Sequence, residues 1–119
     1  MLLQDIPMTV LKNDILQDFA IAYRTSNIEL IAKHLADEIR YDSQLCFGTL
    51  NRDGYIDLMS RRFASKLFEK DELTVIHDPY RYTNPILMLV RNKSKKRYFY
   101  RIEADLDSRK VTAIDECLF

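Results

Sequence analysis

Apolar residues recur every three or four positions in the first third of the chain, which is the spacing of one face of an α-helix. The first stripe predicts a helix that begins after Pro7, with Thr9 or Asn13 as its N-cap. A second helix is predicted after Asn27, which suits the N-cap position, and Ala-Asp-Glu at 36–38 would end it. The two stripes consist of Leu11, Ile15, Phe19, Ala22 and Tyr23, and of Ile28, Ile31 and Leu35.

The period of the pattern changes to two from Ile39, as expected of a β-strand. Tyr41 and Ser43 then share one face of this strand, and Asp42 lies on the other. If Tyr41 and Ser43 face the interior, Asp42 faces solvent, and only a β-bulge would turn it inward. A short return strand, LCFGTL at 45–50, is predicted to pair with this first strand.

Asn51 is the predicted N-cap of a third helix, whose apolar residues follow at four-residue spacing. The remaining pattern predicts four strands, and turns near 92–95 and 106–110 would join the last three in an antiparallel meander. The helix stripe consists of Tyr55, Met59, Phe63 and Leu67, and the strand candidates are 72–80, 85–92, 96–105 and 110–119.

Helices followed by a run of long strands indicate an α+β fold, with the helices packed on one face of a bent sheet. The strand at 85–92 is apolar on both faces, with Ile86 and Met88 on one and Leu87 and Leu89 on the other. Because helices cover only one side of the sheet, a second copy of the chain is the simplest cover for the other. We therefore expect a homodimer through the outer sheet face. The alternative is a central strand that the long side chains of its neighbours shield.

Composition narrows the class of protein but indicates no particular reaction or ligand. A chain of 119 residues that is 47% hydrophobic and 30% charged is typical of one globular domain. It has 18 basic and 18 acidic residues, so no net charge indicates nucleic acid or an acidic membrane surface. Cys46 and Cys117 form no C-x-x-C motif, which indicates reduced thiols. Without a signal-peptide pattern or roughly 18 successive apolar residues, a cytoplasmic location is expected.

The stretch DFAIAYRTSNIELIAKHLADEIRYDS, at 18–43, joins an aromatic-bearing helix, a Ser-Asn-Ile-Glu turn and the entry into a first strand. With the C-terminal meander, this order resembles the nuclear transport factor 2-like superfamily, which includes ketosteroid isomerases and polyketide-cyclase-like (SnoaL-like) enzymes. The resemblance covers nearly all of residues 1–119 as a single domain. It implies a cone-shaped fold of three N-terminal helices on a strongly bent, mostly antiparallel sheet that encloses a pocket. Many members are homodimers, and many bind without catalysis.

Three positions differ from the proton-handling residues that this resemblance implies for a ketosteroid isomerase. The oxyanion-donating tyrosine matches Phe19, the general-base aspartate matches Ser43, and the second acid falls near Arg101. These side chains cannot move a proton as that reaction requires, because it needs a base of near-neutral pKa and two donors aimed at an enolate. A ketosteroid isomerase is therefore not expected, and a non-catalytic role is favoured.

The strand at 96–105 has two different faces, and either could point into the interior of the fold. Matching to the family turns Arg101 and Glu103 into the cone, where they would bind a carboxylate or a polar ligand. Hydrophobicity alone turns the tyrosine face inward, and both arrangements remain open. One face consists of Phe99, Arg101 and Glu103, and the other of Tyr98, Tyr100, Ile102 and Ala104.

Neither histidine predicts a metal site, because no second His or Cys lies at ligand spacing from His34 or His77. His77 would be a general base if it faced the cavity, but a hydrogen-bonded strand histidine is the simpler interpretation. Gly48 and Gly54 are the only glycines, so the chain has no glycine-rich phosphate-binding or dinucleotide-binding loop. No cofactor is expected.

RNKSKKRYFYR, at 91–101, is a dense basic run interleaved with aromatic residues. It would bind single-stranded nucleic acid if its aromatic rings were exposed for stacking. Lysines at a hairpin tip also solvate a turn and protect a sheet edge, so nucleic acid is not the favoured partner.

The favoured function is a dimeric domain that binds a small, largely apolar ligand or a protein partner. The alternative is an isomerase, dehydratase or cyclase that uses His77, Glu103 or Asp115 as acid or base. Two ionisable groups that converge in a cavity would favour the enzyme, whereas a cavity filled by apolar side chains would favour a scaffold. The expected pocket residues are Phe19, Tyr23, Tyr41, Ser43, Phe63, His77, Phe99, Arg101, Glu103, Asp115 and Leu118.

Overall fold

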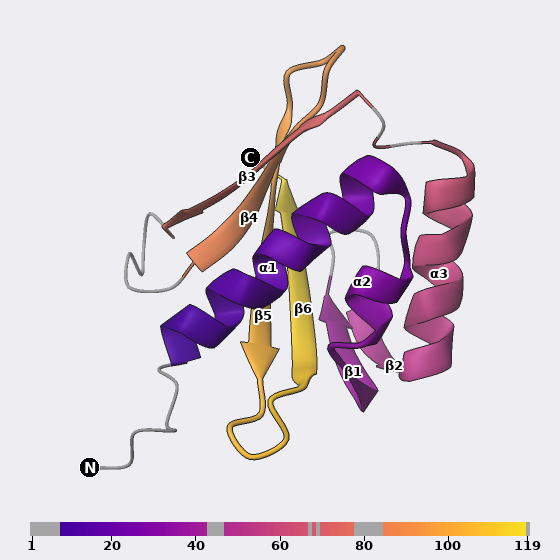
Figure 1. Ribbon diagram of the computed structural model, residues 1–119. Helices are drawn as coiled ribbons and strands as arrows, with labels where there is room; N and C mark the ends of the chain where they lie inside the picture. Colours follow the sequence, from indigo (N-terminus) through magenta and orange to yellow (C-terminus); the bar gives the residue numbers. More distant parts are fainter. Residues whose placement is uncertain (1–7, 43–46, 67, 69, 78–84, 119) are drawn as a thin grey trace.

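The structure is a computed structural model that describes residues 8–42, 47–66, 68, 70–77 and 85–118. Within these residues the chain forms three helices and six strands. The chain forms α1 and α2, then the hairpin β1–β2, then α3, and finally four strands (Figure 1). The bounds are α1 Met8–Thr25, α2 Glu29–Ala32, β1 Leu35–Asp42, β2 Phe47–Asn51, α3 Arg52–Ala64, β3 Glu72–His77, β4 Pro85–Val90, β5 Arg97–Ala104 and β6 Val111–Leu118.

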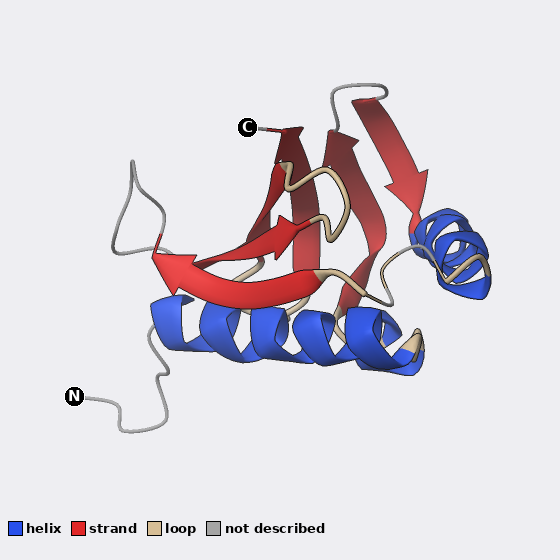
Figure 2. Cartoon of the chain, turned by 90° about the horizontal axis from the view of Figure 1, so that it is seen from above, coloured by secondary structure: helices blue, strands red, loops and turns tan. Residues whose placement is uncertain are grey.

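The six strands form one mixed sheet in the order β2-β1-β6-β5-β4-β3. Only β1 and β6 pair in parallel, and the other four pairings are antiparallel. The predicted meander of the last three strands is confirmed, as is the α+β class with helices packed on the sheet. Figure 2 shows the sheet bending, so that β3 lies along α1 while β2 stands beside α3.

The long helix α1 packs across β3, β4 and β5 and buries the predicted stripe against them. Ile15, Phe19 and Tyr23 are almost fully buried, as periodic apolar positions on a helix should be. At the end of the helix, the Arg24 guanidinium donates a hydrogen bond to the backbone carbonyl of Leu73 and so holds α1 to β3.

The predicted extent of the second helix is wrong. The helix α2 ends at Ala32, and Leu35 already belongs to β1, where it pairs with Val111 of β6. The backbone N–H of Val111 donates to the carbonyl of His34 at 2.7 Å, so sheet pairing begins where the helical pattern was expected to continue. The predicted N-cap is also wrong by one residue, because Ile28 occupies that position; Asn27 precedes it, and its side-chain oxygen accepts from the Glu29 N–H at 3.1 Å.

The predicted start of α3 is confirmed. The side-chain oxygen of Asn51 accepts from the Gly54 N–H at 2.7 Å, which satisfies one of the unpaired donors of the first turn. A Cβ at Gly54 would stand 2.9 Å from that oxygen, so glycine permits the close approach. Tyr55, Met59 and Phe63 are buried on one face of the helix, and Leu67 lies outside the described residues.

None of the described helices is both long and apolar enough to cross a membrane.

Candidate functional site

Strand pairing decides which side chains of the sheet face the helices. Residues directly opposite each other in neighbouring strands project from the same face. Tyr100 is paired with Glu116 on one side and Leu87 on the other, and Tyr41 is paired with Ile114. Because Leu87, Tyr100 and Ile114 belong to the buried core, Glu116 projects from the core-facing side of β6.

Arg62 of α3 reaches this buried glutamate. Its Nη1 lies 3.3 Å from Glu116 Oε1, and its Nη2 lies 3.3 Å from the Tyr41 hydroxyl. The side chain of Glu116 is only 11% exposed and that of Arg62 is 29% exposed. Three ionisable groups from β1, α3 and β6 therefore converge within hydrogen-bonding distance at the edge of the core.

Three further tyrosines surround this contact. The rings of Tyr41 and Tyr55 lie 5.6 Å apart, as do those of Tyr23 and Tyr100. The hydroxyls of Tyr23 and Tyr55 are buried and have no hydrogen-bond partner within the described part of the chain. An unsatisfied buried donor is rare in a folded protein and calls for an explanation. We name this set the inner cluster: Tyr23, Tyr41, Tyr55, Arg62, Tyr100 and Glu116.

Burial controls the protonation of the inner cluster. It raises the pKa of Glu116, and Arg62 and the hydrogen bond with Tyr41 oppose that increase. Burial and the negative charge of Glu116 raise the pKa of Tyr41 to about 12. The pKa values of Tyr23 and Tyr55 are raised well above the ordinary value, mainly by burial. The phenols are therefore neutral hydrogen-bond donors near pH 7, beside a carboxyl that binds its proton more tightly than usual.

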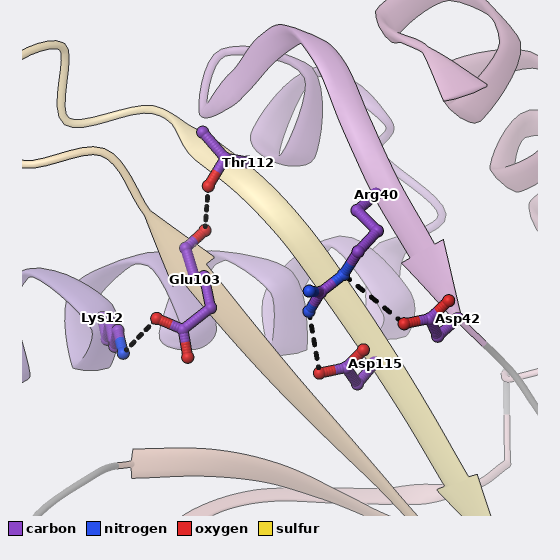
Figure 3. A network of polar contacts seen from close by, with 6 residues as sticks. All are labelled: Lys12, Arg40, Asp42, Glu103, Thr112 and Asp115. Atoms are coloured by element: carbon purple, nitrogen blue, oxygen red, sulfur yellow. Dashed lines mark hydrogen bonds and ion pairs between the residues drawn. The ribbon is translucent and has the colours of Figure 1, made fainter. Parts of the chain in front are cut away.

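The opposite face of the sheet carries a separate group of charges. Arg40 lies between Asp42 and Asp115, with Nε 3.4 Å from Asp42 Oδ2 and Nη2 3.6 Å from Asp115 Oδ2 (Figure 3). Burial and the nearby Asp42 carboxylate raise the pKa of Asp115, whereas Arg40 and Arg101 lower it. Arg101 pairs with Asp115 across β5 and β6 and so shares this outer face.

Glu103 is occupied elsewhere. Its carboxylate lies 3.2 Å from the ammonium of Lys12, a lysine of α1 that is almost completely buried (Figure 3). Its backbone carbonyl accepts from the Thr112 hydroxyl at 3.4 Å. Glu103 therefore joins α1 to β5, and its side chain remains 53% exposed.

Apart from Glu103, the expected pocket residues fall into three groups. Phe19, Tyr23, Tyr41 and Phe63 lie in the core between helices and sheet. Phe99 is buried on the face opposite to Tyr100, and Arg101 and Asp115 share that outer side. Ser43 lies outside the described residues, and the side chains of His77 and Leu118 are not among those described. The tyrosine face of β5, not the Arg101 face, therefore points towards the helices.

Sequence reasoning overlooked Arg62 and Glu116. Strand alternation offered a signal for Glu116, because it shares a face with the apolar Ile114 whereas Asp115 does not. Helix periodicity offered a signal for Arg62, which lies three residues after Met59 and seven after Tyr55, whereas Arg61 falls outside that stripe. Within the described residues, no three His, Cys, Asp or Glu side chains are grouped as a metal site would require.

Comparison with known proteins agrees with this architecture. A SnoaL-like protein of unknown function from Burkholderia thailandensis superposes with a TM-score of 0.70 at 12% identity, over 96% of this chain and 99% of the other. A nuclear transport factor 2-like protein of unknown function from Cytophaga hutchinsonii superposes with a TM-score of 0.64 at 14% identity, over 91% and 89%. This chain has the nuclear transport factor 2-like fold.

A proposed ketosteroid isomerase from Kribbella flavida also shares the nuclear transport factor 2-like fold, with a TM-score of 0.59 at 13% identity over 93% of this chain and 79% of the other. No protein-family model matches the sequence, and no curated protein does. At such low identities the shared fold is the only property that carries over, so function has to be argued from the residues of this chain.

Proposed function

We propose that this domain binds a small, neutral, largely apolar molecule at the inner cluster. The observation that carries the proposal is the pair of buried hydroxyls, on Tyr23 and Tyr55, that have no partner among the described residues. Leaving a buried donor unpaired costs about 1–3 kcal/mol. A ligand oxygen that accepts from either hydroxyl would recover this free energy.

The charges of the inner cluster favour a neutral ligand. Arg62 and Glu116 already balance one another, so a charged ligand would leave one charge uncompensated in a largely buried site. The neighbouring rings favour an apolar body, because Tyr23 packs edge-on against Phe63 at 5.4 Å and stacks on Phe68 at 4.6 Å. A compact ketone or alcohol meets both requirements.

Ligand entry requires the core to open. The hydroxyl oxygens of Tyr23 and Tyr55 have almost no accessible surface, whereas Arg62 and Glu116 are partly exposed. Phe19 and Phe63 are buried in the same core, and the same packing is expected of a scaffold that binds no ligand. The proposal therefore implies that α3 moves relative to the sheet when a ligand enters beside Arg62.

The test uses 2-tetralone, a neutral ketone with an apolar skeleton, titrated into isotope-labelled protein and followed by NMR. We expect the double variant Tyr23→Phe/Tyr55→Phe to bind at least about tenfold more weakly, because two hydrogen bonds of about 1 kcal/mol each are lost. The same variant should be at least as stable as the wild type, because it loses two unsatisfied hydroxyls.

The matched control is Tyr98→Phe, a half-buried tyrosine on the same face of β5 that lies outside the inner cluster. It should bind 2-tetralone as the wild type does. Unchanged affinity in the double variant, or affinity lost equally in the control, would exclude the inner cluster as the binding site.

A second candidate function is acid–base catalysis by Glu116. It is favoured by the raised pKa of this carboxyl, which moves towards the range of a general acid or base. The same titration in D₂O distinguishes the two functions. An enzyme that removes protons next to a carbonyl would accelerate deuterium uptake by 2-tetralone and lose this effect in Glu116→Gln, whereas a binding domain would not accelerate it.

We also propose, as the sequence led us to expect, that the chain forms a homodimer through the outer sheet face. On this face, Ile86 and Phe99 are already buried within one chain. The apolar surface available to a second copy therefore consists of the half-buried Ile76, Met88 and Val90. The Arg40–Asp42–Asp115 group beside it carries both signs of charge, as a self-complementary twofold interface can use.

Sedimentation velocity tests the homodimer. Met88→Lys should convert a wild-type dimer to a monomer, because the lysine would bury a charge at the centre of the interface. Leu106→Lys, at a position that is 69% exposed in the β5–β6 turn, should leave the dimer intact. A wild type that sediments as a monomer at high concentration would contradict the proposal.

A further inference from the structure

A basic pocket lies near the strands β3 and β4, at the edge of the sheet that is far from β1. It is formed between the segment that follows α3 and the hairpin that joins β4 to β5, which projects beyond the helices (Figure 1). Its volume is about 460 Å³, and four cationic side chains and one carboxylate line it. The charged lining residues are Lys66, Lys70, Asp71, Arg91 and Lys93.

Asp71 fixes the two walls of this pocket to each other. Its Oδ1 accepts from the backbone N–H of Asn92 at 2.9 Å, and its Oδ2 lies 3.3 Å from Arg91 Nη1. The Asp71 side chain is only 5% exposed and that of Arg91 is 29% exposed. The hairpin itself is closed by backbone bonds, from Arg91 to Lys96 at 2.9 Å and from Lys95 to Arg91 at 3.0 Å. The floor of the pocket is therefore a largely buried ion pair, in which Asp71 Oδ2 accepts no hydrogen bond from the described residues.

Three ammonium groups around this floor have no counter-charge among the described residues, which leave out Glu69. Asp71 is matched by Arg91, and among the described residues no carboxylate lies within ion-pair distance of Lys66, Lys70 or Lys93. The chain as a whole has equal numbers of basic and acidic residues, so this excess of positive charge is local. Concentrated positive charge in a concave site attracts anions more strongly than the same charge on a flat surface.

We propose that this pocket binds a small, multiply charged phosphate anion. Ammonium groups from both walls can reach oxygens that bear more than one negative charge, and lysine is a common ligand of phosphate groups. Asn92 and Ser94 add neutral hydrogen-bonding groups to the lining. A monovalent anion would engage only part of this positive charge.

The aromatic residues next to the hairpin favour a small anion over nucleic acid. Tyr98 and Tyr100 of β5 face the helices with the core, and Phe99 is buried on the other face. Binding of single strands usually combines a basic groove with exposed rings on which bases stack. The rings of these three residues do not provide such a surface.

The experiment is a titration of the full chain with inorganic pyrophosphate, followed by isothermal calorimetry at low and at physiological salt. We expect measurable binding that weakens as salt rises, and binding at least about tenfold weaker in Lys66→Gln/Lys70→Gln/Lys93→Gln. The matched control is Lys95→Gln/Lys96→Gln, two exposed lysines of the same hairpin that do not line the pocket. The control should retain wild-type affinity.

Three results would overturn the proposal. One is equal weakening in the control, which would mean that the hairpin attracts anions without a defined site. Another is binding of acetate, a monovalent anion, as tight as that of pyrophosphate. The third is binding of an oligothymidylate in place of pyrophosphate, which would make the hairpin a nucleic-acid surface. All variants change exposed lysines, so thermal denaturation should show an unaltered fold.

Discussion

Arg62→Met is expected to lower the free energy of unfolding by about 3 kcal/mol at pH 8, because it leaves the Glu116 carboxylate largely buried without its partner. Removing one member of a buried ion pair typically costs about 3–5 kcal/mol, and the 29% exposure of Arg62 places this contact at the lower end. The measurement is urea denaturation of variant and wild type across a series of pH values.

The loss should depend on pH in a direction that identifies Glu116. The pKa of Glu116 is raised in the folded wild type, and it should rise further without Arg62, which lowers it. A folded state that holds the proton more tightly is favoured below the pKa of the unfolded chain, about 4.3 for Glu, and loses stability as pH rises through the folded pKa. The free energy of unfolding of Arg62→Met should therefore approach the wild-type value near pH 4 and drop below it as the pH rises towards 8.

Two further variants isolate this effect. Adding Glu116→Gln to Arg62→Met should recover most of the lost stability at pH 8 and remove the additional pH dependence, because no charge remains to be buried. Arg61→Met, one position earlier, breaks only an exposed pair with Asp57 and should cost less than about 0.5 kcal/mol. A loss in Arg62→Met that is the same at every pH would mean that packing, and not the charge of Glu116, explains it.

The parts of the fold that the sequence predicted are those whose signals are local. The α1 stripe runs from Leu11 to Tyr23 along most of an 18-residue helix and allows one interpretation. Asn51 caps α3 through a bond that spans three residues. Turns rich in polar residues separate β4, β5 and β6, so the meander follows from neighbours in the sequence.

The boundary between α2 and β1 depended on a distant partner. Leu35 suits the inward face of a helix that continues from Ile31, and it equally suits the first inward position of a strand. Val111 of β6 decides between them, because it pairs with Leu35 from more than seventy residues away. No local pattern contains that parallel pairing, so the helical interpretation extended too far.

The inner cluster could not be predicted from the sequence for a related reason. Glu116 and Arg62 are 54 residues apart, and although periodicity places each beside a buried face of its own element, no local pattern indicates that they meet. They meet because α3 packs on β1, and β1 pairs with β6 in the sheet. That Tyr23 and Tyr55 find no hydroxyl partner in the described part of the chain follows only from three-dimensional packing, since a tyrosine in an apolar stripe usually keeps its hydroxyl bonded or at the surface.

The orientation of β5, which the sequence left open, leads to the second large effect. Ile102→Ala should lower the free energy of unfolding by about 3 kcal/mol, because Ile102 is buried among core residues and its truncation leaves a cavity. Arg101→Ala, one residue earlier, should cost less than about 1 kcal/mol, because Arg101 is a partly exposed charged residue on the outer face. Chemical denaturation of both variants measures the difference.

This pair of variants tests the face assignment without assuming any ligand. If family matching had been right and the Arg101 face pointed into the cone, Arg101→Ala would leave buried carboxylates such as Asp115 without their cation and would be the more damaging change. Ile102 would then lie outside and tolerate alanine. Because adjacent residues of one strand share nearly the same backbone and differ in face, the order of the two losses reports orientation directly. A larger loss in Arg101→Ala would reverse the orientation of β5 and remove Tyr100 and Glu116 from the inner cluster.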